Sequence, residues 1–152
     1  MEQKSKVYLY QTAVSWTEQR KGMISCAGKP DVQVATPPEF KGHEGIWSPE
    51  DLFVASANIC LMTTFLAVAE RAGLAFSAYE STAEGRLELV EGKFQFTAIT
   101  IRPSITVKSG EDVGKAKELI EKAERNCLIS NSMKAAVTLE PVIHEHGGTT
   151  SR

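Results

Sequence analysis

Residues 47–73 read WSPEDLFVASANICLMTTFLAVAERAG and contain a long apolar stretch. Ser48 offers an oxygen for the N-terminal cap of a helix, Pro49 suits the first helical position, and Gly73 suits the end. The pattern therefore predicts one helix from Pro49 to Ala72, on the order of 35 Å long at about 1.5 Å per residue. Because this helix is apolar on nearly every side, other elements have to surround it, and we expect it to form the core.

The same stretch is apolar enough to raise the question of a membrane span. Polar residues interrupt it, and charged residues flank it closely at both ends, so a buried core helix is the better interpretation. The interrupting residues are Ser56, Asn58, Thr63 and Thr64. Residues 1–6 are polar, and no apolar segment follows them as it would in a secretory signal. We therefore expect a cytoplasmic protein with no membrane partner.

The segments before this helix alternate between apolar and polar residues in the pattern of strands. We predict strands over 7–16, 23–27 and 32–35, with a hairpin turn near 18–22. Two prolines and two glycines interrupt any ladder over 36–45, which is therefore expected to be a loop.

The segments after the helix predict a long hairpin and a second helix. Residues 78–90 and 94–107 flank a short turn, and Pro103 implies an edge position or a bulge there. A helix over 111–126 and a last strand over 135–142 follow. This order of elements, dominated by hairpins, predicts an α+β fold with antiparallel sheets around the central helix rather than a parallel α/β sheet.

The whole chain, 1–152, is expected to form one domain, with residues 1–5 and 147–152 frayed. A single long apolar helix needs cover on every side, and the chain contains only one other sizeable helix. We therefore hypothesise a homodimer in which the central helices of two chains pack against each other.

Length and charge exclude several classes of partner. The chain has 152 residues, with 17 Lys and Arg against 19 Asp and Glu, and a net charge of −2. It contains no basic tract of five or more residues, so a nucleic-acid partner is not expected. His43, His144 and His146 lack the spacing of a metal site and are expected on the solvated surface. We predict neither a metal nor a cofactor.

Three cysteines, Cys26, Cys60 and Cys127, are the candidates for chemistry. An odd count without a secretion signal argues against a disulfide framework, and the plain interpretation is three packed thiols. Burial alone would raise the pKa of Cys60 and leave it inert, so a reactive Cys60 requires a nearby cation. Cys127 follows the second predicted helix, where backbone N–H groups can lower the pKa of a thiol. Cys26 is expected to be a packing residue.

Two motifs resemble those of one protein family. Residues 47–60, WSPEDLFVASANIC, resemble the Pro-Glu-acid-Leu…Cys helix of the OsmC/Ohr family, the osmotically inducible and organic hydroperoxide resistance proteins. Residues 127–131, CLISN, are similar to the second motif of that family, Cys-Pro-x-Ser-(Asn/Gln), with Leu128 in place of the proline. The order of elements and the length match over nearly the whole chain. The resemblance implies an intertwined homodimer, active sites near the subunit interface, and thiol-dependent reduction of organic hydroperoxides.

The resemblance also implies a role for individual residues. By position, Cys60 is the peroxidatic thiol, Cys127 is the resolving thiol, and Glu50 orients an arginine beside the thiolate. Arg20, in the first hairpin turn, matches the branch of the family that takes this arginine from the N-terminal region. Another branch takes it from the loop before the long helix, and here that loop, 36–47, contains a lysine but no arginine.

Two hypotheses about function follow. In the first, the Cys60 thiolate attacks the O–O bond of an organic hydroperoxide, and the resulting sulfenic acid condenses with Cys127 to a disulfide. An external thiol or dithiol then reduces the disulfide, and apolar residues around Cys60 favour organic substrates over hydrogen peroxide. The alternative is a catalytically silent dimer of the same fold that binds a small apolar ligand or partner. Peroxide consumption at Cys60 distinguishes the two.

Overall fold

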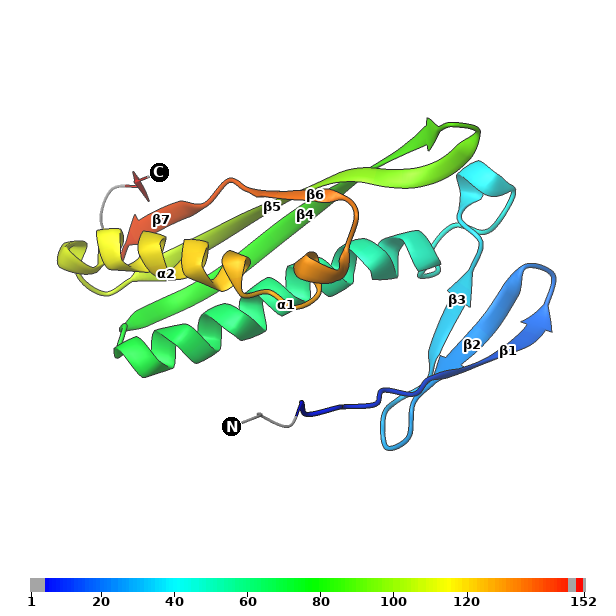
Figure 1. Ribbon diagram of the computed structural model, residues 1–152, viewed down its shortest axis with the longest axis horizontal. Helices are drawn as coiled ribbons and strands as arrows, with labels where there is room; N and C mark the ends of the chain where they lie inside the picture. The colour runs from blue at the N-terminus through cyan, green and yellow to red at the C-terminus, as the bar shows by residue number, and fades with distance from the viewer. Residues whose placement is uncertain (1–4, 148–149, 152) are drawn as a thin grey trace. The chain divides into compact units, whose positions relative to one another are not determined.

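The computed structural model describes residues 5–147 and 150–151 of the chain (Figure 1). The chain divides into two compact units, Met1–Leu52 and Phe53–Arg152, and helix α1 (Pro49–Ala72) is continuous across the division. The single domain expected over 1–152 stays a prediction. Of the segments expected to be frayed, residues 1–4, 148–149 and 152 lie outside the described residues.

The first unit contains a three-stranded antiparallel sheet in the order β1-β2-β3. Its strands are β1 (Ala13–Glu18), β2 (Lys21–Ser25) and β3 (Val32–Ala35). The strand predicted over 7–16 is wrong in its first half, because residues 7–12 have no partner strand within the described part of the chain. The second strand begins at Lys21 rather than Met23, because the hairpin turns at Gln19 and Arg20.

Both ends of α1 are as predicted. The backbone N–H of Asp51 donates to Ser48 Oγ over 3.1 Å, and the Ser48 N–H donates to Asp51 Oδ2 over 3.0 Å, so the side chains cap the first turn reciprocally. Gly73 follows the last helical residue at φ +69°, a left-handed conformation that a side chain would disfavour. The helix predicted over Pro49–Ala72 is confirmed.

The second unit contains a mixed five-stranded sheet centred on β5 (Lys93–Val107). Strand β4 (Phe76–Val90) pairs with β5 in the predicted antiparallel hairpin. The single strand predicted over 135–142 is two strands, β6 (Ala136–Leu139) and β7 (Val142–Glu145), and both run parallel to β5. The last strand, β8 (Thr150–Ser151), pairs with β7 inside the tail that was expected to be frayed.

Pro103 lies in the middle of the central strand, so the predicted edge position or bulge is wrong. Ile101 O accepts a hydrogen bond from Glu140 N over 2.9 Å. Further along β5, Val107 O accepts one from His146 N over 2.8 Å. Residues two apart in a strand direct their backbone groups to the same side, so the Pro103 nitrogen also faces the side of β6 and β7. It lies between the stretch of β5 that pairs with β6 and the stretch that pairs with β7. The missing N–H therefore interrupts no ladder there.

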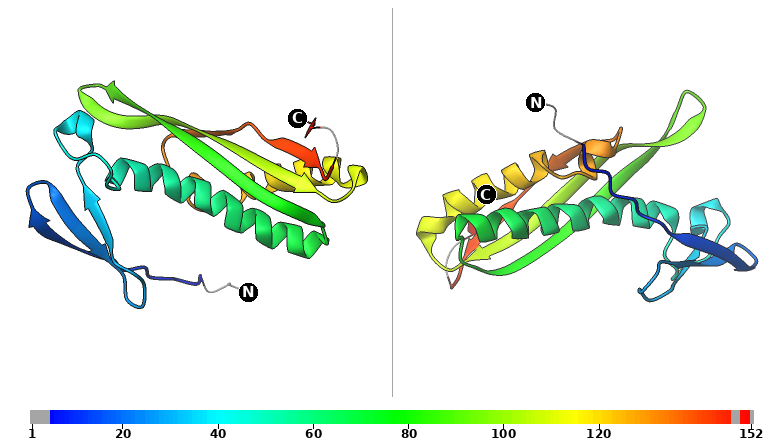
Figure 2. Two further views of the ribbon diagram at one scale, coloured as in Figure 1. Left: turned by 180° about the vertical axis from the view of Figure 1, so that it is seen from behind. Right: turned by 60° about the horizontal axis from the view of Figure 1, so that its bottom comes forward.

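The core of the second unit lies between the sheet and two helices, α1 and α2 (Val113–Arg125), which pack against it (Figures 1 and 2). Its fully buried members include Ala57, Leu61, Phe65, Ile99, Ile101, Ile105, Val107, Ala116, Ile120 and Ala123. Gly85 of β4 allows the close approach of α1, because a Cβ there would lie 2.5 Å from Val54 Cγ2. The predicted α+β class is confirmed by this arrangement.

The chain itself leaves one side of α1 exposed, and the homodimer expected to cover it stays a prediction. Ile59 is 56% exposed and Leu66 is 39% exposed, whereas Leu61 and Phe65 on the inner side are completely buried. Among the described residues, α1 is the one helix that is long and apolar enough to cross a membrane by length and composition. Its inner side packs in the core of the second unit, as a core helix does.

Candidate functional site

Two cysteines from distant parts of the sequence meet in the second unit. Cys60 lies in the middle of α1, and Cys127 lies two residues after the end of α2. Both thiols are free and buried, with Cys60 retaining 9% exposure and Cys127 none. Each thiol acts as a hydrogen-bond partner that shifts the pKa of the other. Of the residues predicted to form the site, these two are brought together.

The turn after α2 places Cys127 and the residues that follow it. The Cys127 N–H donates to Glu124 O over 3.2 Å, which continues the last helical turn. The Asn131 N–H then donates to Cys127 O over 3.0 Å, and Ser132 Oγ donates to Leu128 O over 2.8 Å. These bonds close a compact turn, so the backbone N–H groups within it have fixed directions.

The pKa of Cys60 lies below its ordinary value, although burial by itself raises it. Hydrogen-bond donors around the sulfur outweigh burial: the Cys127 thiol first, then the Ile129 N–H, the Thr64 hydroxyl and the Leu128 N–H. Thr64 Oγ1 lies 3.8 Å from Cys60 Sγ, one turn further along α1. None of these donors is charged, so neutral groups of the second unit lower this pKa without the cation that the sequence led us to expect.

The pKa of Cys127 is shifted in the opposite direction. Burial raises the pKa of Cys127, the Ser130 hydroxyl lowers it in part, and the neighbouring Cys60 raises it again. Ser130 Oγ lies 3.4 Å from Cys127 Sγ. Of the two sulfurs, Cys60 is therefore the one that ionises more readily, with the Cys127 thiol as a hydrogen-bond donor beside it.

Arg20 and Glu50 lie in the first unit, and there the structure does not pair them. Arg20 is exposed, and its Nη1 donates to Phe40 O over 3.1 Å. Glu50, in the first turn of α1, has a buried Oε1 with no hydrogen-bond partner among the described residues. Within the described part of the chain, no ion pair joins Arg20 to Glu50. Their roles beside the thiolate stay a prediction.

The family model described as OsmC-like protein matches residues 42–142, about two thirds of the chain. The chain belongs to the OsmC family. It is 31% identical over 110 residues to the uncharacterised protein YmaD of Bacillus subtilis, covering 70% of this chain and 73% of that protein. It is 29% identical over 101 residues to peroxiredoxin OsmC of Escherichia coli, covering 66% of this chain and 69% of that protein. Its fold is similar to that of an organic hydroperoxide resistance protein from Elizabethkingia anophelis, with TM-score 0.73, 22% identity, and coverage of 92% and 98%.

Leu128 is where this chain departs from the OsmC/Ohr motif that its sequence resembles. Proline has no backbone N–H, whereas the Leu128 N–H is one of the donors that lower the pKa of Cys60. The departure therefore adds a donor to the thiolate. Sequence reasoning missed both the backbone donors and Thr64, because it searched for charged side chains; the spacing of Thr64, four residues after Cys60 on one helix, was the available signal.

The remaining candidates lie outside the thiol site. Cys26 is half-buried just after β2 rather than packed in the core, and its Sγ donates to Gln11 O over 3.6 Å. His144 is not solvated as expected, because it is half-buried and its Nε2 lies 2.7 Å from Ser104 Oγ. Within residues 5–147 and 150–151, no three His, Cys, Asp or Glu side chains are arranged to hold a metal.

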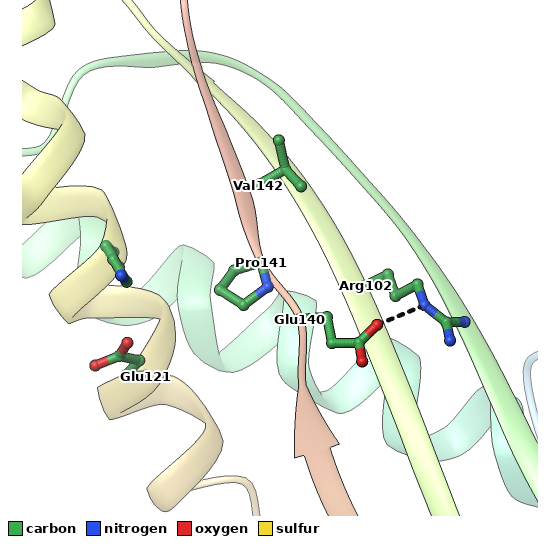
Figure 3. A pocket seen from close by; sticks show the side chains of 6 residues that line it. Arg102, Glu121, Glu140, Pro141 and Val142 are labelled. Atoms are coloured by element: carbon green, nitrogen blue, oxygen red, sulfur yellow. Dashed lines mark hydrogen bonds and ion pairs between the residues drawn. The ribbon is translucent and has the colours of Figure 1, made fainter. Parts of the chain in front are cut away.

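A groove of about 640 Å³ lies on the second unit beside α2 and the sheet (Figure 3). It is lined by Arg102, Lys117, Glu121, Glu140, Pro141 and Val142 and contains neither cysteine of the thiol site. The Arg102 guanidinium is already paired, with Nε 2.9 Å from Glu140 Oε1 and Nη2 3.6 Å from Glu84 Oε1. This groove is therefore separate from the candidate site, and its charges neutralise one another.

Proposed function

We propose that this OsmC-family chain is a thiol-dependent peroxidase that reduces organic hydroperoxides to alcohols, with Cys60 as the peroxidatic and Cys127 as the resolving cysteine. One observation carries the proposal: two buried thiols share a hydrogen bond, and their pKa values are moved apart, that of Cys60 down and that of Cys127 up. Such a pair provides a thiol that ionises more readily than usual and, beside it, a thiol that holds its proton more firmly. An inert packing cysteine has no need of either.

In the first step, the Cys60 thiolate attacks one oxygen of the O–O bond. The S–O bond forms, the O–O bond breaks, Cys60 becomes a sulfenic acid, and the alkoxide takes up a proton and leaves as the alcohol. The residual exposure of Cys60, against none for Cys127, supports this assignment of roles because the substrate has to reach the attacking sulfur.

In the second step, Cys127 attacks the sulfur of the Cys60 sulfenic acid. The S–S bond forms, the S–O bond breaks, and the oxygen leaves as water. The contact between the two thiols supports resolution within one chain, because two cysteines can bridge only when their backbones lie close together. An external thiol or dithiol reduces the disulfide, and we place the protein in the cytoplasm, where such reductants are abundant.

An apolar substrate suits the residues beside each cysteine. Ile59 precedes Cys60 and is 56% exposed, and Leu128 follows Cys127 and is 67% exposed. A hydroperoxide with a hydrocarbon group can bury that group against such side chains, at about 25 cal/mol per Å² of apolar surface removed from water, whereas hydrogen peroxide has none to bury.

We further propose that the active protein is a homodimer and that Arg20 and Glu50 act in it beside the Cys60 thiolate. Strand β1 is exposed at each of its six residues, among them Val14 and Trp16, and the outer side of α1 exposes Leu66. Apolar surface of this kind is typical of an interface that a second copy covers. In that role, Arg20 holds the developing alkoxide charge, and Glu50 orients the guanidinium.

Thiol titration with an alkyl hydroperoxide tests the proposed peroxidase. The wild-type chain is expected to lose two thiols per subunit and to form the Cys60–Cys127 disulfide, identified by peptide mass. Cys60→Ser is expected to lower the rate of peroxide consumption at least about 10³-fold, because the nucleophile is gone.

Two further variants separate the roles. Cys127→Ser is expected to complete one turnover and to accumulate a sulfenic acid that a dimedone probe labels. Cys26→Ser is the matched control, a half-buried cysteine outside the site, and is expected to retain wild-type turnover. Wild-type consumption of peroxide by Cys60→Ser would show the peroxidase proposal to be wrong, and a stable monomer in sedimentation at micromolar concentration would do the same for the dimer.

A further inference from the structure

A half-buried carboxyl lies beside the thiol site and has no role in the chemistry described above. Glu124 belongs to the last turn of α2, one turn before Cys127, and its backbone oxygen accepts the Cys127 N–H over 3.2 Å. Its Oε2 is buried and has no hydrogen-bond partner within the described residues. A buried acceptor without a donor destabilises the fold, so a role in the chemistry would explain its position.

Ser130 lies between this carboxyl and the resolving cysteine. Its Oγ is 3.4 Å from Cys127 Sγ, and the same hydroxyl lies beside the Glu124 carboxyl. Burial raises the pKa of Glu124, and the Ser130 hydroxyl offsets part of that rise. No charged side chain of the described residues contributes to the shift, so burial and one hydroxyl account for it.

The resolving step needs a group that removes a proton. Only the thiolate form of Cys127 is a good nucleophile, yet burial raises the pKa of Cys127. Ser130 has no stable charged form to hold the proton by itself. A carboxyl reached through its hydroxyl can hold that proton, and a carboxyl in an apolar setting is a stronger base than an exposed one.

We propose that Glu124, acting through the Ser130 hydroxyl, accepts the proton of Cys127 when the disulfide with Cys60 forms. This inference rests on the proposed function, because it requires Cys127 to be the resolving thiol. Glu124 is here a positioning residue, since it touches neither sulfur of the new bond and acts only through Ser130, whose hydroxyl proton it accepts.

The hydroxyl of Ser130 has two acceptors to choose from. When it donates to Cys127 Sγ, it supports a negative sulfur; when it turns to the Glu124 carboxyl, its own lone pairs face the Cys127 S–H. The second orientation allows a concerted transfer. The S–H bond of Cys127 breaks and its proton goes to Ser130 Oγ, while the Ser130 proton goes to the Glu124 carboxylate.

The step balances without any further reactant. The Cys127 thiolate attacks the Cys60 sulfur, the S–S bond forms with the electron pair of Cys127, and the S–O bond breaks with its pair on oxygen. The departing hydroxide takes a proton from solvent and becomes water. Glu124 later returns to solvent the proton that came from Cys127, so sulfenic acid and thiol together yield disulfide and water.

Rapid-quench measurements of a single turnover separate the two chemical steps and test the inference. After mixing with one equivalent of an alkyl hydroperoxide, loss of peroxide reports the first step, and the Cys60–Cys127 disulfide, quantified by peptide mass, reports the second. Glu124→Gln is expected to leave the first rate unchanged and to slow the second at least about tenfold. Ser130→Ala is expected to slow the second step similarly, since it removes the bridge.

The pH profile distinguishes this role from a merely structural one. In the wild-type chain, the rate of disulfide formation is expected to fall as pH drops through the pKa of Glu124, which lies above its ordinary value of 4.5. Glu124→Gln is expected to lose this acid limb. Glu121→Gln is the matched control, because Glu121 is exposed on the same helix and is expected to keep both the rate and the limb.

The possible outcomes distinguish this inference from the proposed peroxidase function on which it rests. If the wild-type chain forms the disulfide and Glu124→Gln and Ser130→Ala form it at the wild-type rate with the same acid limb, the Glu124 inference is wrong and the peroxidase stands. If the wild-type chain forms no Cys60–Cys127 disulfide on peroxide treatment, both are wrong. Slowing of the second step by Glu121→Gln to the same degree would also overturn the specific role of Glu124.

Discussion

The two units of the chain use their apolar residues in opposite ways. In the second unit, β5 buries Ile99, Ile101, Ile105 and Val107 completely beneath α1 and α2. In the first unit, β1 is exposed along its whole length, and Trp16 is 76% exposed. The second unit therefore contains its own core and its own thiol pair, whereas the first unit, which carries Arg20 and Glu50, leaves the apolar side chains of β1 exposed.

The groups that lower the pKa of Cys60 and the charged residues predicted for the site lie in different units. The donors that lower the pKa of Cys60 all belong to the second unit, and none of them is charged. The charged residues predicted for the site belong to the first unit. In the proposed mechanism, the neutral donors of the second unit therefore favour the thiolate, and the charged residues serve the transition state, where negative charge moves to the leaving oxygen.

Removing a large side chain from each unit tests the comparison most strongly. Phe65→Ala is expected to lower the free energy of unfolding by about 3–5 kcal/mol, because Phe65 is completely buried against Phe76 and Tyr79. Trp16→Ala is expected to change it by less than about 0.5 kcal/mol in the monomer, because the ring is largely exposed. Chemical denaturation at low protein concentration measures both. A large loss for Trp16→Ala there would contradict the contrast between the units.

Replacing Arg20 separates preparation of the thiolate from stabilisation of the leaving group. Arg20→Ala is expected to lower kcat/KM for an alkyl hydroperoxide about 10²-fold and to leave the pKa of Cys60 below its ordinary value, since the neutral donors remain. Stopped-flow kinetics and thiol alkylation against pH measure the two effects. Lys29→Ala, an exposed cation in the same unit, is the control. Return of the Cys60 pKa to that of a free thiol would refute this division of labour.

Leu128→Pro tests the backbone donors of the second unit. The substitution removes one N–H from the Cys60 sulfur, so the pKa of Cys60 is expected to rise and the alkylation rate at neutral pH to fall about tenfold. Leu128→Ala keeps the N–H and removes the side chain, and it is expected to alkylate at the wild-type rate. Equal rates for the two variants would show that the N–H does not act on the thiolate.

The smallest expected effect concerns pH and stability. Because the pKa of Glu124 is raised in the folded chain, the folded state holds a proton that the unfolded state has released above pH 4.5. Stability is therefore expected to fall as pH rises from 4.5 through the folded pKa, by well under about 1 kcal/mol since the group is partly solvated. Urea denaturation of the wild-type chain and Glu124→Gln across this range measures it; identical pH dependence in both would contradict it.

Local signals in the sequence were sufficient for some elements and failed for others. Ser48, Pro49 and Gly73 predict both ends of α1, because capping depends on neighbouring residues alone. The strand expected from residue 7 begins at Ala13, because alternation does not say whether a partner strand exists. The place of Pro103 in the central strand was missed for a similar reason. A proline is tolerated there because it lies in the gap between the stretches of β5 paired with β6 and β7, and no residue near it in the sequence indicates that gap.

The long capped helix, the α+β order of elements and the two cysteine motifs are predictable from the sequence, because each depends on residues that lie close together along the chain. The folded chain adds the contact between Cys60 and Cys127, the N–H groups of Leu128 and Ile129 at the sulfur, and the place of Glu124 beside Ser130. A backbone N–H is present at almost every position, so only the path of the folded turn makes it a donor to a particular atom.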